Sequence, residues 1–488
     1  MRKRNLLFLF TDEQRADTMA AYGNKKIDVP HLNRLADDSV VFEKCYVSQP
    51  VCTPSRSTIM TGLWPHTNGC IANNIPLGED TRCLPEMTSG YRTAYFGKWH
   101  LGDEIFAQHG FEHWISIEDM YRKYYREGKD RDARSTYHHW LVAKGYKPNP
   151  DDGVFGRRMT AGYPEPDCKP AYLAVETSRW LWSLGKDEPF IGYVNFLEPH
   201  MPFTGPRDDQ YPLDFVDLPK NFADIPGESN PVKARMLHAL YTREGFGGVS
   251  LDNEAGWRRL IANYWGLVSQ VDAAVGTILE TLHACGKADD TIIVYTSDHG
   301  DMMGSHQLLA KTVMYEEAAT VPLLIKAPGL RPRVERQVVS QVDLVPTLLD
   351  MMGEEVPEEL PGQSLAPLLG TGVAPGQRDV FIEWNGRDSG ASKVESPKTI
   401  PEYLAKLASP EVLSRALRDP VRTVITADRW KLNHSPDMGE HELYDLNADP
   451  YERHNLYGQA AHADRVAAMR NRLTEWGRRC GDDAAAGI

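Results

Sequence analysis

Short apolar runs alternate along the chain with longer amphipathic stretches. Four of the runs have the length of a β-strand, and they cover residues 5–10, 190–197, 291–296 and 321–325. Strands that are apolar throughout are typical of a parallel sheet buried on both faces. Residues 255–284 instead carry apolar side chains three and four positions apart, which predicts a long helix with one buried face. The pattern therefore predicts an α/β fold, with a large, mostly parallel sheet sandwiched between helices.

The pattern changes after residue 375. Short strand-like runs and one later helical stretch cover residues 380–384, 421–426, 430–433, 442–444 and 461–478. Strands followed by a helix are typical of an antiparallel sheet with a helix packed on it. We therefore expect a large α/β domain over residues 1–375 and a smaller C-terminal α+β subdomain over residues 376–488.

The composition is that of an ordinary soluble globular protein, with 41% hydrophobic and 25% charged residues in a chain of 488. The formal net charge of −14 argues against a nucleic-acid partner, because binding to phosphates needs a basic face. A site for an anionic substrate would have to gather its cations locally. No stretch has the roughly 20 apolar residues of a membrane span, so we expect no membrane partner. The composition is compatible with an oligomer.

The N-terminus and the cysteines bear on the location of the protein. The chain starts with basic residues, but the apolar run behind them spans only about six residues and has no small-residue cleavage site, which predicts a first strand rather than a signal peptide. The seven cysteines are scattered and include no Cys-x-x-Cys pair, which argues against a disulfide framework and a zinc ribbon. A cytoplasmic location is the simplest interpretation. Removal of a signal peptide, giving a periplasmic or secreted protein, would leave the same pattern.

Residues that could bind a metal ion stand at the ends of two predicted strands. Asp12 and Glu13 follow the first strand, and Asp298 and His299 follow the strand at 291–296. Ligands of open α/β sheets bind beyond the carboxyl ends of the strands. Three carboxylates suit a hard cation such as Ca²⁺ or Mg²⁺, while the imidazole leaves Mn²⁺ or Zn²⁺ open. Each residue alone could be a turn, a helix cap or an ordinary loop histidine. Convergence at one edge favours a metal site.

The pentapeptide Cys52-Thr53-Pro54-Ser55-Arg56 opens a short apolar helical stretch. Thr53 suits an N-cap and Pro54 the first helical position, which predicts Cys52 just ahead of a surface-facing helix start. Backbone N–H groups favour an anion there. Arg56, one turn into the helix, could grip a tetrahedral oxyanion with its guanidinium fork. The alternative is a buried, inert cysteine beside a helix cap.

Further motifs follow along the chain. They are Thr-Asp-Glu-Gln-Arg-Ala-Asp at 11–17, Gly-Lys-Trp-His-Leu-Gly at 97–102, Glu-Pro-His-Met-Pro-Phe at 198–203, Ser-Asp-His-Gly-Asp at 297–301, Lys311, and the segments 341–347 and 442–450. Together with the pentapeptide they resemble, in order, the motifs of the type I sulfatases, a family of the alkaline phosphatase superfamily. The resemblance spans almost the whole chain. The stretches near 111–165, 204–250 and 385–415 diverge from it, and Glu13 stands where the family more commonly has Asp.

The resemblance implies an enzyme that hydrolyses sulfate esters with an oxidised cysteine. A formylglycine-generating maturation enzyme would convert Cys52 into Cα-formylglycine, whose hydrate is the nucleophile of the family. It also implies one divalent metal ion, with Ca²⁺ expected first and Mg²⁺ or Mn²⁺ as alternatives. The implied metal ligands are Asp12, Glu13, Cys52, Asp298 and His299.

The resemblance further implies roles for the cations and histidines. Arg56, Lys98 and Lys311 would stabilise the sulfate oxygens together with the metal. His200, with Lys311, would protonate the leaving oxygen, and His100 would accept a proton as sulfate is eliminated. These roles supply what sulfuryl transfer needs, namely charge stabilisation and proton transfer around an oxygen nucleophile.

Two other functions compete with this interpretation. A phosphonate or phosphate mono- or diester hydrolase could use the same scaffold, although Lys98 and His100 together favour sulfate esters. A sulfatase-like binding protein with an unmodified cysteine would be non-catalytic, but every candidate catalytic residue type is present.

We expect a sulfated carbohydrate or an aryl or alkyl sulfate as the substrate. Segments 146–167 and 202–231 are long enough to be lids or substrate walls. The stretch 121–126, rich in Tyr and Arg, and the side chains of Trp114 and Trp140 suit a sugar platform and protein packing equally.

Overall fold

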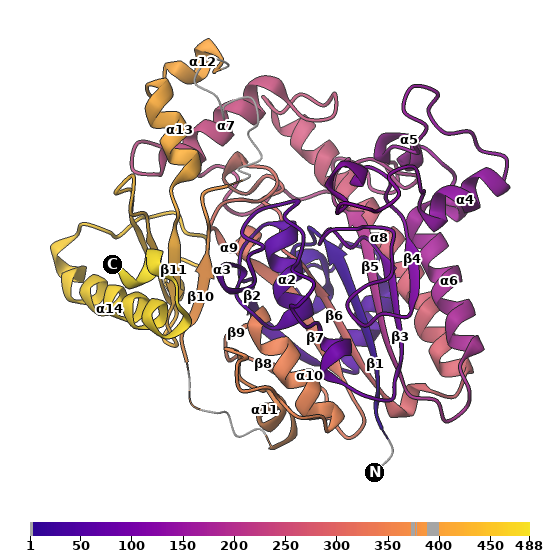
Figure 1. Ribbon diagram of the computed structural model, residues 1–488. Helices are drawn as coiled ribbons and strands as arrows, with labels where there is room; N and C mark the ends of the chain where they lie inside the picture. The colour runs from indigo at the N-terminus through magenta and orange to yellow at the C-terminus, as the bar shows by residue number, and fades with distance from the viewer. Residues whose placement is uncertain (1–2, 372–375, 377, 388–399) are drawn as a thin grey trace.

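The computed structural model describes residues 3–371, 376, 378–387 and 400–488 (Figure 1). Within these residues a large sheet has the strand order β4-β3-β5-β1-β6-β7-β2-β8, with β9 beside β2. Its strands are β1 (Asn5–Asp12), β2 (Val40–Tyr46), β3 (Arg92–Gly97), β4 (His113–Ser116), β5 (Phe190–Pro199), β6 (Thr291–Ser297), β7 (Thr320–Lys326), β8 (Arg333–Glu335) and β9 (Val339–Ser340). In this sheet, among the described residues, β7 is the one strand that pairs antiparallel with its neighbours. The predicted mostly parallel sheet is therefore confirmed.

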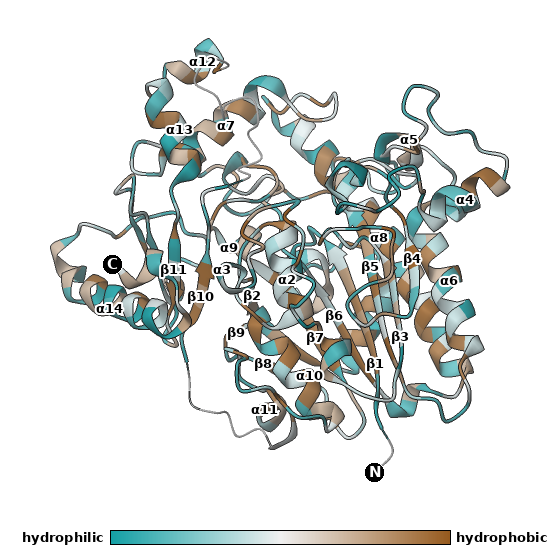
Figure 2. Ribbon diagram, viewed as in Figure 1, coloured by the Kyte–Doolittle hydropathy of each residue, from teal (hydrophilic) through white to brown (hydrophobic). Residues whose placement is uncertain are grey.

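Helices cover both faces of this sheet. The α-helices described before the C-terminal region are α1 (Pro30–Asp37), α2 (Cys52–Thr61), α3 (Pro65–Asn68), α4 (Thr136–Ala143), α5 (Arg157–Ala161), α6 (Lys169–Ser183), α7 (Val232–Glu244), α8 (Glu254–Ala284), α9 (Glu316–Ala319), α10 (Leu344–Met352) and α11 (Ala366–Thr371). The helix predicted at 255–284 is α8, which starts one residue earlier. The strands of the sheet are predominantly hydrophobic in Figure 2, as a sheet covered on both sides requires.

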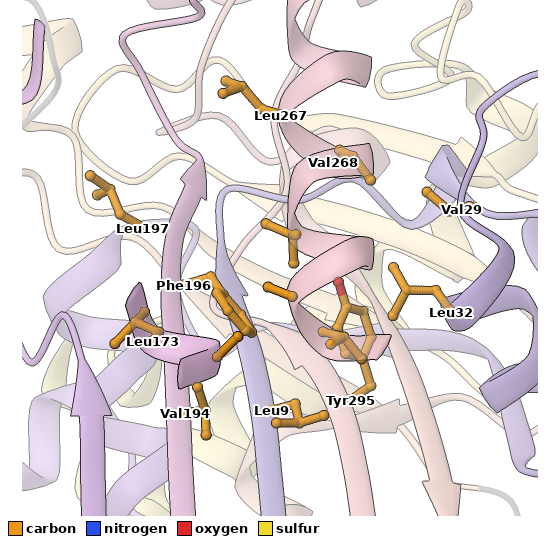
Figure 3. Close-up of a cluster of buried hydrophobic side chains, with 14 of the residues drawn as sticks. Leu9, Val29, Leu32, Leu173, Val194, Phe196, Leu197, Leu267, Val268 and Tyr295 are labelled. Carbon is orange, nitrogen blue, oxygen red and sulfur yellow. The ribbon is translucent and has the colours of Figure 1, made fainter. Parts of the chain in front are cut away.

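Side chains of β1 alternate between two cores. Leu7 and Leu9 lie in the core beneath α8 and α1, whereas Phe8 and Phe10 lie in the opposite core beneath α2 and α10. Figure 3 shows Leu9 together with Val268 of α8 in the first of these cores. Because β1 is central and buried on both faces, the residues at its carboxyl end are held rigidly.

The C-terminal region forms a second, antiparallel sheet with the order β10-β11-β12-β13. Its elements are β10 (Val380–Glu383), α12 (Glu402–Ala405), α13 (Pro410–Arg418), β11 (Arg422–Ile425), β12 (Trp430–His434), β13 (Glu442–Asp445), α14 (Ala463–Cys480) and α15 (Asp483–Ala486). Leu473 and Trp476 of α14 pack on this sheet through Phe381 and Leu443. The predicted strands and terminal helix are thus present. Residue 375, where we expect the domain boundary, lies outside the described residues, and the division into two domains stays a prediction.

The structure describes both segments predicted as lids or substrate walls and both tryptophans of the predicted sugar platform. Segment 146–167 contains α5, and segment 202–231 holds neither an α-helix nor a strand. Trp114 stacks on Tyr95, with ring centroids 4.9 Å apart, and Trp140 packs against Tyr172. Both tryptophans therefore serve protein packing. In the part of the chain that the structure describes, no helix is both long and apolar enough to cross a membrane.

Gly97 ends β3 immediately before Lys98. It pairs with Asn195 of β5 and has a φ of +112°, a conformation that favours glycine. A Cβ at this position would lie 1.8 Å from the carbonyl oxygen of Asn195. The close approach of these two strands therefore requires glycine, and it fixes where the next side chain begins.

We expect Gly97→Ala to lower the free energy of unfolding by about 3 kcal/mol or more, because the change adds a backbone clash to an unfavourable φ. Gly23→Ala is the matched control, since Gly23 has a φ of +100° but nothing within 4 Å of a Cβ. It should cost only about 1–2 kcal/mol. Denaturant unfolding measures both changes, and equal destabilisation by the two would contradict the role of the strand contact.

Candidate active site

The carboxyl ends of β1 and β6 bring the first four candidate residues together. β1 ends at Asp12, and Asp298 and His299 follow β6, which pairs with β1 in parallel. The backbone N–H of Glu13 donates a hydrogen bond of 3.0 Å to Asp298 Oδ1. All four residues have no exposed surface. The convergence that the sequence predicts is therefore present.

Helix α2 starts earlier than the sequence predicts. Val51 is the extended residue before the helix, and Cys52 is already its first residue. Thr53 is not the N-cap, because its hydroxyl donates a hydrogen bond of 2.8 Å to the backbone carbonyl of His100. Cys52 is 2% exposed, so the expected surface-facing helix start is wrong. The side chain nevertheless lies at a helix N-terminus, inside a closed site.

The guanidinium of Arg56 joins two carboxylates. Its Nη2 lies 2.8 Å from Asp12 Oδ2, and its Nε lies 2.9 Å from Asp298 Oδ2. Its Nη1 donates to Asn195 Oδ1 at 2.7 Å and to the backbone carbonyl of Lys98 at 2.8 Å. The fork that we expected to face an oxyanion is thus occupied by protein. We infer that Arg56 orients the carboxylates.

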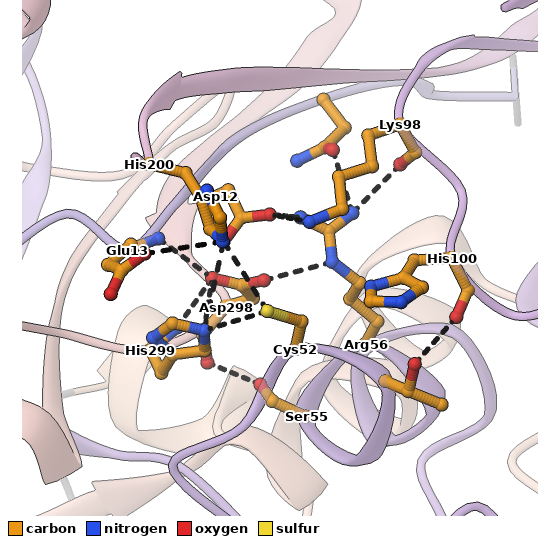
Figure 4. A network of polar contacts seen from close by, with 12 residues as sticks. Asp12, Glu13, Cys52, Ser55, Arg56, Lys98, His100, His200, Asp298 and His299 are labelled. Carbon is orange, nitrogen blue, oxygen red and sulfur yellow. Dashed lines mark hydrogen bonds and ion pairs between the residues drawn. The ribbon is translucent and has the colours of Figure 1, made fainter. Parts of the chain in front are cut away.

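Four side chains point their ligand atoms into one small space, as Figure 4 shows. Ligand atoms of Asp12, Cys52, Asp298 and His299 all lie within 4.8 Å of one another. Cys52 Sγ is 3.3 Å from His299 Nε2 and 3.7 Å from Asp12 Oδ1. His299 Nδ1 lies 2.9 Å from the carbonyl of Gly300, which places the ring proton on Nδ1 and leaves a lone pair on Nε2. Arg56 holds the Oδ2 atoms, so the Oδ1 atoms are the ones that face this space. Asp298 Oδ1 already accepts hydrogen bonds from the backbone N–H groups of Glu13 and His299, and it lies 3.6 Å from His299 Nε2. The donor set of carboxylate oxygens and an imidazole nitrogen fits a cation.

Glu13 lies apart from that group. Its Oε2 is 2.8 Å from Lys311 Nζ and 3.4 Å from His200 Nε2. Burial raises the pKa of Glu13 to about 8, although Lys311 opposes the shift. Ligation of the metal by Glu13 stays a prediction, and here this carboxylate pairs with a lysine and a histidine.

His200 has a defined tautomer. Its Nδ1 lies 2.8 Å from the backbone carbonyl of Met201, so that nitrogen carries a proton. Its Nε2, 3.1 Å from Lys311 Nζ, is then the acceptor. Burial and the charge of Lys311 hold the pKa of His200 well below its usual range. The His200 ring is therefore neutral, and the Lys311 ammonium lies next to its acceptor nitrogen, Nε2.

Lys98 and His100 lie on the other side of Cys52 from His299 (Figure 4). Lys98 Nζ forms an ion pair with Asp12 Oδ2. Burial alone would raise the pKa of Asp12, but Lys98, Arg56 and the neighbouring histidines together outweigh it, and the pKa lies well below the usual range. Burial and the charge of Lys98 likewise lower the pKa of His100 well below its usual range. Among the described residues, His100 Nδ1 has no hydrogen-bond partner, so it is a neutral, buried base.

Sequence reasoning missed several polar residues around this centre. Asn195 accepts a hydrogen bond from Arg56. The sequence signal that could have marked Asn195 is its position as a lone polar residue within the apolar run of β5. Asn74 Oδ1 lies 3.1 Å from His100 Nε2. Tyr121 and Arg157 come from the divergent stretch 111–165, where no motif marks them. The ring of Tyr121 packs against His100, tilted by 34° with centroids 4.4 Å apart, and Arg157 Nη1 lies 3.4 Å from His200 Nδ1.

The architecture and this site define a hydrolase with the alkaline-phosphatase-like fold. A phosphonate monoester hydrolase from Silicibacter pomeroyi has a similar structure, with a TM-score of 0.77, 24% identity, and 99% of this chain and 96% of that chain covered. A protein solved with its substrate D-glucosamine-2-N,6-O-disulfate gives a TM-score of 0.72 at 23% identity, with 99% of each chain covered.

Sequence comparison identifies the family. The N-acetylglucosamine-6-O-sulfatase of Bacteroides thetaiotaomicron is 25% identical over 97% of this chain and 86% of its own length. A family model described as Sulfatase matches residues 4–354. The chain belongs to the sulfatase family, which confirms the resemblance seen in the sequence and the assignment as a sulfuric ester hydrolase.

We expect Ca²⁺, Mg²⁺ or Mn²⁺ to stabilise the protein, because a cation would relieve the repulsion between converging carboxylates. At a cation concentration a hundred times the dissociation constant, the gain should be about 2.7 kcal/mol. Asp298→Asn and His299→Ala should abolish the gain. Asp209→Asn, whose side chain is 99% exposed, should retain it. Thermal unfolding before and after chelation measures this gain. Absence of bound metal by elemental analysis, with no shift on its addition, would refute the site.

Proposed function

We propose that this protein hydrolyses a sulfate ester of a carbohydrate, using a formylglycine made from Cys52 and one divalent cation. One observation carries the proposal: Cys52 Sγ stands among Asp12 Oδ1, Asp298 Oδ1 and His299 Nε2 at the start of α2. When present, the cation would polarise the sulfate oxygens and the hydrated aldehyde would supply an oxygen nucleophile. A formylglycine-generating enzyme is the partner that this modification requires.

The cation is expected to be Ca²⁺, with Mg²⁺ or Mn²⁺ as alternatives. With sulfur at position 52, the donor set contains two carboxylate oxygens, one nitrogen and one thiol. Metals that accept soft ligands such as sulfur suit this mixture. Replacement of the thiol by an oxygen would give three oxygens and one nitrogen. That set suits hard cations. The proposed modification and the proposed metal therefore support each other.

Two ammonium groups would bind the transferred group. Lys98 pairs with Asp12 and Lys311 pairs with Glu13. Each has a carboxylate that fixes its position and leaves further N–H donors. Arg56 contributes by holding the two aspartates. Developing charge on the sulfate oxygens would meet donors already in place, which is the arrangement that lowers a barrier most.

The two histidines have separate proton roles in the proposal. His100 is neutral, and its buried Nδ1 can accept a proton when sulfate is released. His200 presents Nε2 to Lys311 Nζ at 3.1 Å. A proton from that ammonium can pass through Nε2 to the leaving oxygen, after which the neutral ring is restored. General acid and general base thus stand on opposite sides of residue 52.

Hydrolysis of phosphonate or phosphate esters is the second candidate. It is supported by the fold shared with a phosphonate monoester hydrolase, at 24% identity. The presence of both Lys98 and His100, buried beside the centre, favours sulfate. A carbohydrate substrate is supported by the N-acetylglucosamine-6-O-sulfatase relative and by the structural neighbour that binds a disulfated glucosamine. An unmodified binding protein is the remote alternative.

We expect Cys52→Ala to reduce turnover of an aryl sulfate to less than about a tenth of wild type, since loss of the covalent route should cost several kcal/mol. Conversion of the thiol to an aldehyde should also lower the intact mass of the wild type by about 18 Da. Cys285→Ala, a half-buried cysteine at the end of α8, is the matched control and should keep both properties. An unshifted mass together with full activity of Cys52→Ala would sink the proposal.

We further expect kcat/KM for an aryl sulfate to exceed that for the matching aryl phosphate and phosphonate by at least about a hundredfold. Lys98, Lys311 and the divalent cation should bind the transferred group of all three esters. The second half of the reaction must expel the transferred group with only His100 to accept a proton, and a phosphate dianion leaves less readily than sulfate. Steady-state kinetics with one shared leaving group measure the ratio. If the phosphonate is the better substrate, the second candidate function replaces the first.

A further inference from the structure

A group of charged residues outside the sulfatase motifs borders the site. Glu118, Tyr121 and Arg157 lie in the divergent stretch 111–165, between β4 and α6. Arg157 is the first residue of α5, which lies beyond the carboxyl ends of β4 and β5 in Figure 1. The segment predicted as a lid or substrate wall therefore contributes a guanidinium at the edge of the site.

One side of Arg157 is fixed by protein. Glu118 Oε2 accepts a hydrogen bond of 2.6 Å from Arg157 Nε, and the hydroxyl of Tyr121 accepts one of 2.8 Å from Nη2. Glu118 Oε1 pairs with Lys169. Burial would raise the pKa of Glu118, but Arg157 and Lys169 lower it to about 2. This carboxylate is therefore ionised, and it is shared by two cations.

The other side of Arg157 faces the catalytic histidines. Its Nη1 lies 3.4 Å from His200 Nδ1, but that nitrogen donates its proton to the carbonyl of Met201 at 2.8 Å and has no lone pair to offer. Nη1 thus has no good acceptor among the described residues. The ring of Tyr121, whose hydroxyl accepts from Nη2, packs against His100. Only 15% of the Arg157 side chain is exposed, so an acceptor for Nη1 would come from a ligand in the site.

We propose that Arg157 Nη1 binds a second anionic group, a carboxylate or a sulfate, on the leaving alcohol of the substrate. The inference rests on the proposed function, in which His200 protonates the leaving oxygen. Because Arg157 Nη1 lies 3.4 Å from the His200 ring, it would meet the substituents of that alcohol. A guanidinium binds planar or tetrahedral anions through paired N–H groups. The charge of Arg157 is not needed at the transferred sulfate, because Lys98 and Lys311 lie there. Arg157 is then a specificity residue.

The test compares three esters with similar leaving groups: 3-carbamoylphenyl sulfate, which is neutral at the ring substituent, 3-carboxyphenyl sulfate and 3-sulfonatophenyl sulfate. Wild type should prefer one of the charged esters over the neutral one by about tenfold or more in kcat/KM. Arg157→Met should reduce this preference to less than about threefold, mainly through KM. Arg157→Lys should keep part of it, and the better of the two charged esters distinguishes a carboxylate from a sulfate.

Two control variants separate specificity from structure. Arg158→Met alters the neighbouring exposed arginine and should keep the full preference. Tyr121→Phe keeps the ring against His100 but removes the acceptor of Nη2, and it should weaken the preference less than Arg157→Met. Thermal unfolding shows whether each variant is folded. We expect Arg157→Met to fold, because Glu118 stays paired with Lys169 when Arg157 is replaced. Equal loss on neutral and charged esters, or no preference in wild type, would overturn the proposal.

Binding to the Cys52→Ala protein makes the test independent of turnover. Calorimetry with the neutral and charged esters should show the same preference as a ratio of dissociation constants, and Arg157→Met in that background should remove it. If wild type hydrolyses none of the esters, the proposed function fails, while this ratio still decides the role of Arg157. Equal dissociation constants for neutral and charged esters would overturn the role even where hydrolysis is found.

Discussion

The structure of the site depends on the bridge that Arg56 makes between Asp12 and Asp298. Both carboxylates are fully buried, and two such charges side by side would be costly without a partner. The guanidinium takes Oδ2 of each aspartate, and Asn195 and a backbone carbonyl occupy its remaining face. The two Oδ1 atoms are thereby turned toward His299 and Cys52. One buried arginine thus sets the direction in which both carboxylates can act.

The charges around this bridge are nearly balanced within the protein. Arg56, Lys98 and Lys311 stand against Asp12, Asp298 and Glu13 in a chain whose formal net charge is −14, and Glu13 carries only part of a charge at neutral pH because burial raises its pKa to about 8. Attraction for an anionic ester would then come chiefly from a bound divalent cation, since the local side chains largely neutralise one another. This balance explains how an acidic protein can hold a closed, cation-rich site without a basic surface.

The sequence predicted the parts of the molecule that burial and strand ends dictate. Strands β1, β5 and β6 are apolar throughout because helices cover both faces, and the residues behind β1 and β6 meet because parallel strands end at one edge. Local hydrogen-bond choices were less predictable. Thr53 has the chemistry of an N-cap, yet its hydroxyl binds the carbonyl of His100. Arg157 starts the short helix α5 in the divergent stretch 111–165, whose path no periodicity reveals. Such contacts depend on which distant segment lies opposite.

The small C-terminal sheet has a structural connection to the site. Lys431 of β12 is buried and pairs with Glu316 of α9 at 3.2 Å and with Glu452 at 2.8 Å. Glu452 also accepts a hydrogen bond of 2.6 Å from the backbone N–H of Glu316. This brace holds the segment that carries Lys311 a few residues earlier, and the backbone of Thr312 is in turn bonded to Pro50, just before Cys52. The position of the Lys311 ammonium therefore depends on packing that begins more than a hundred residues later in the chain.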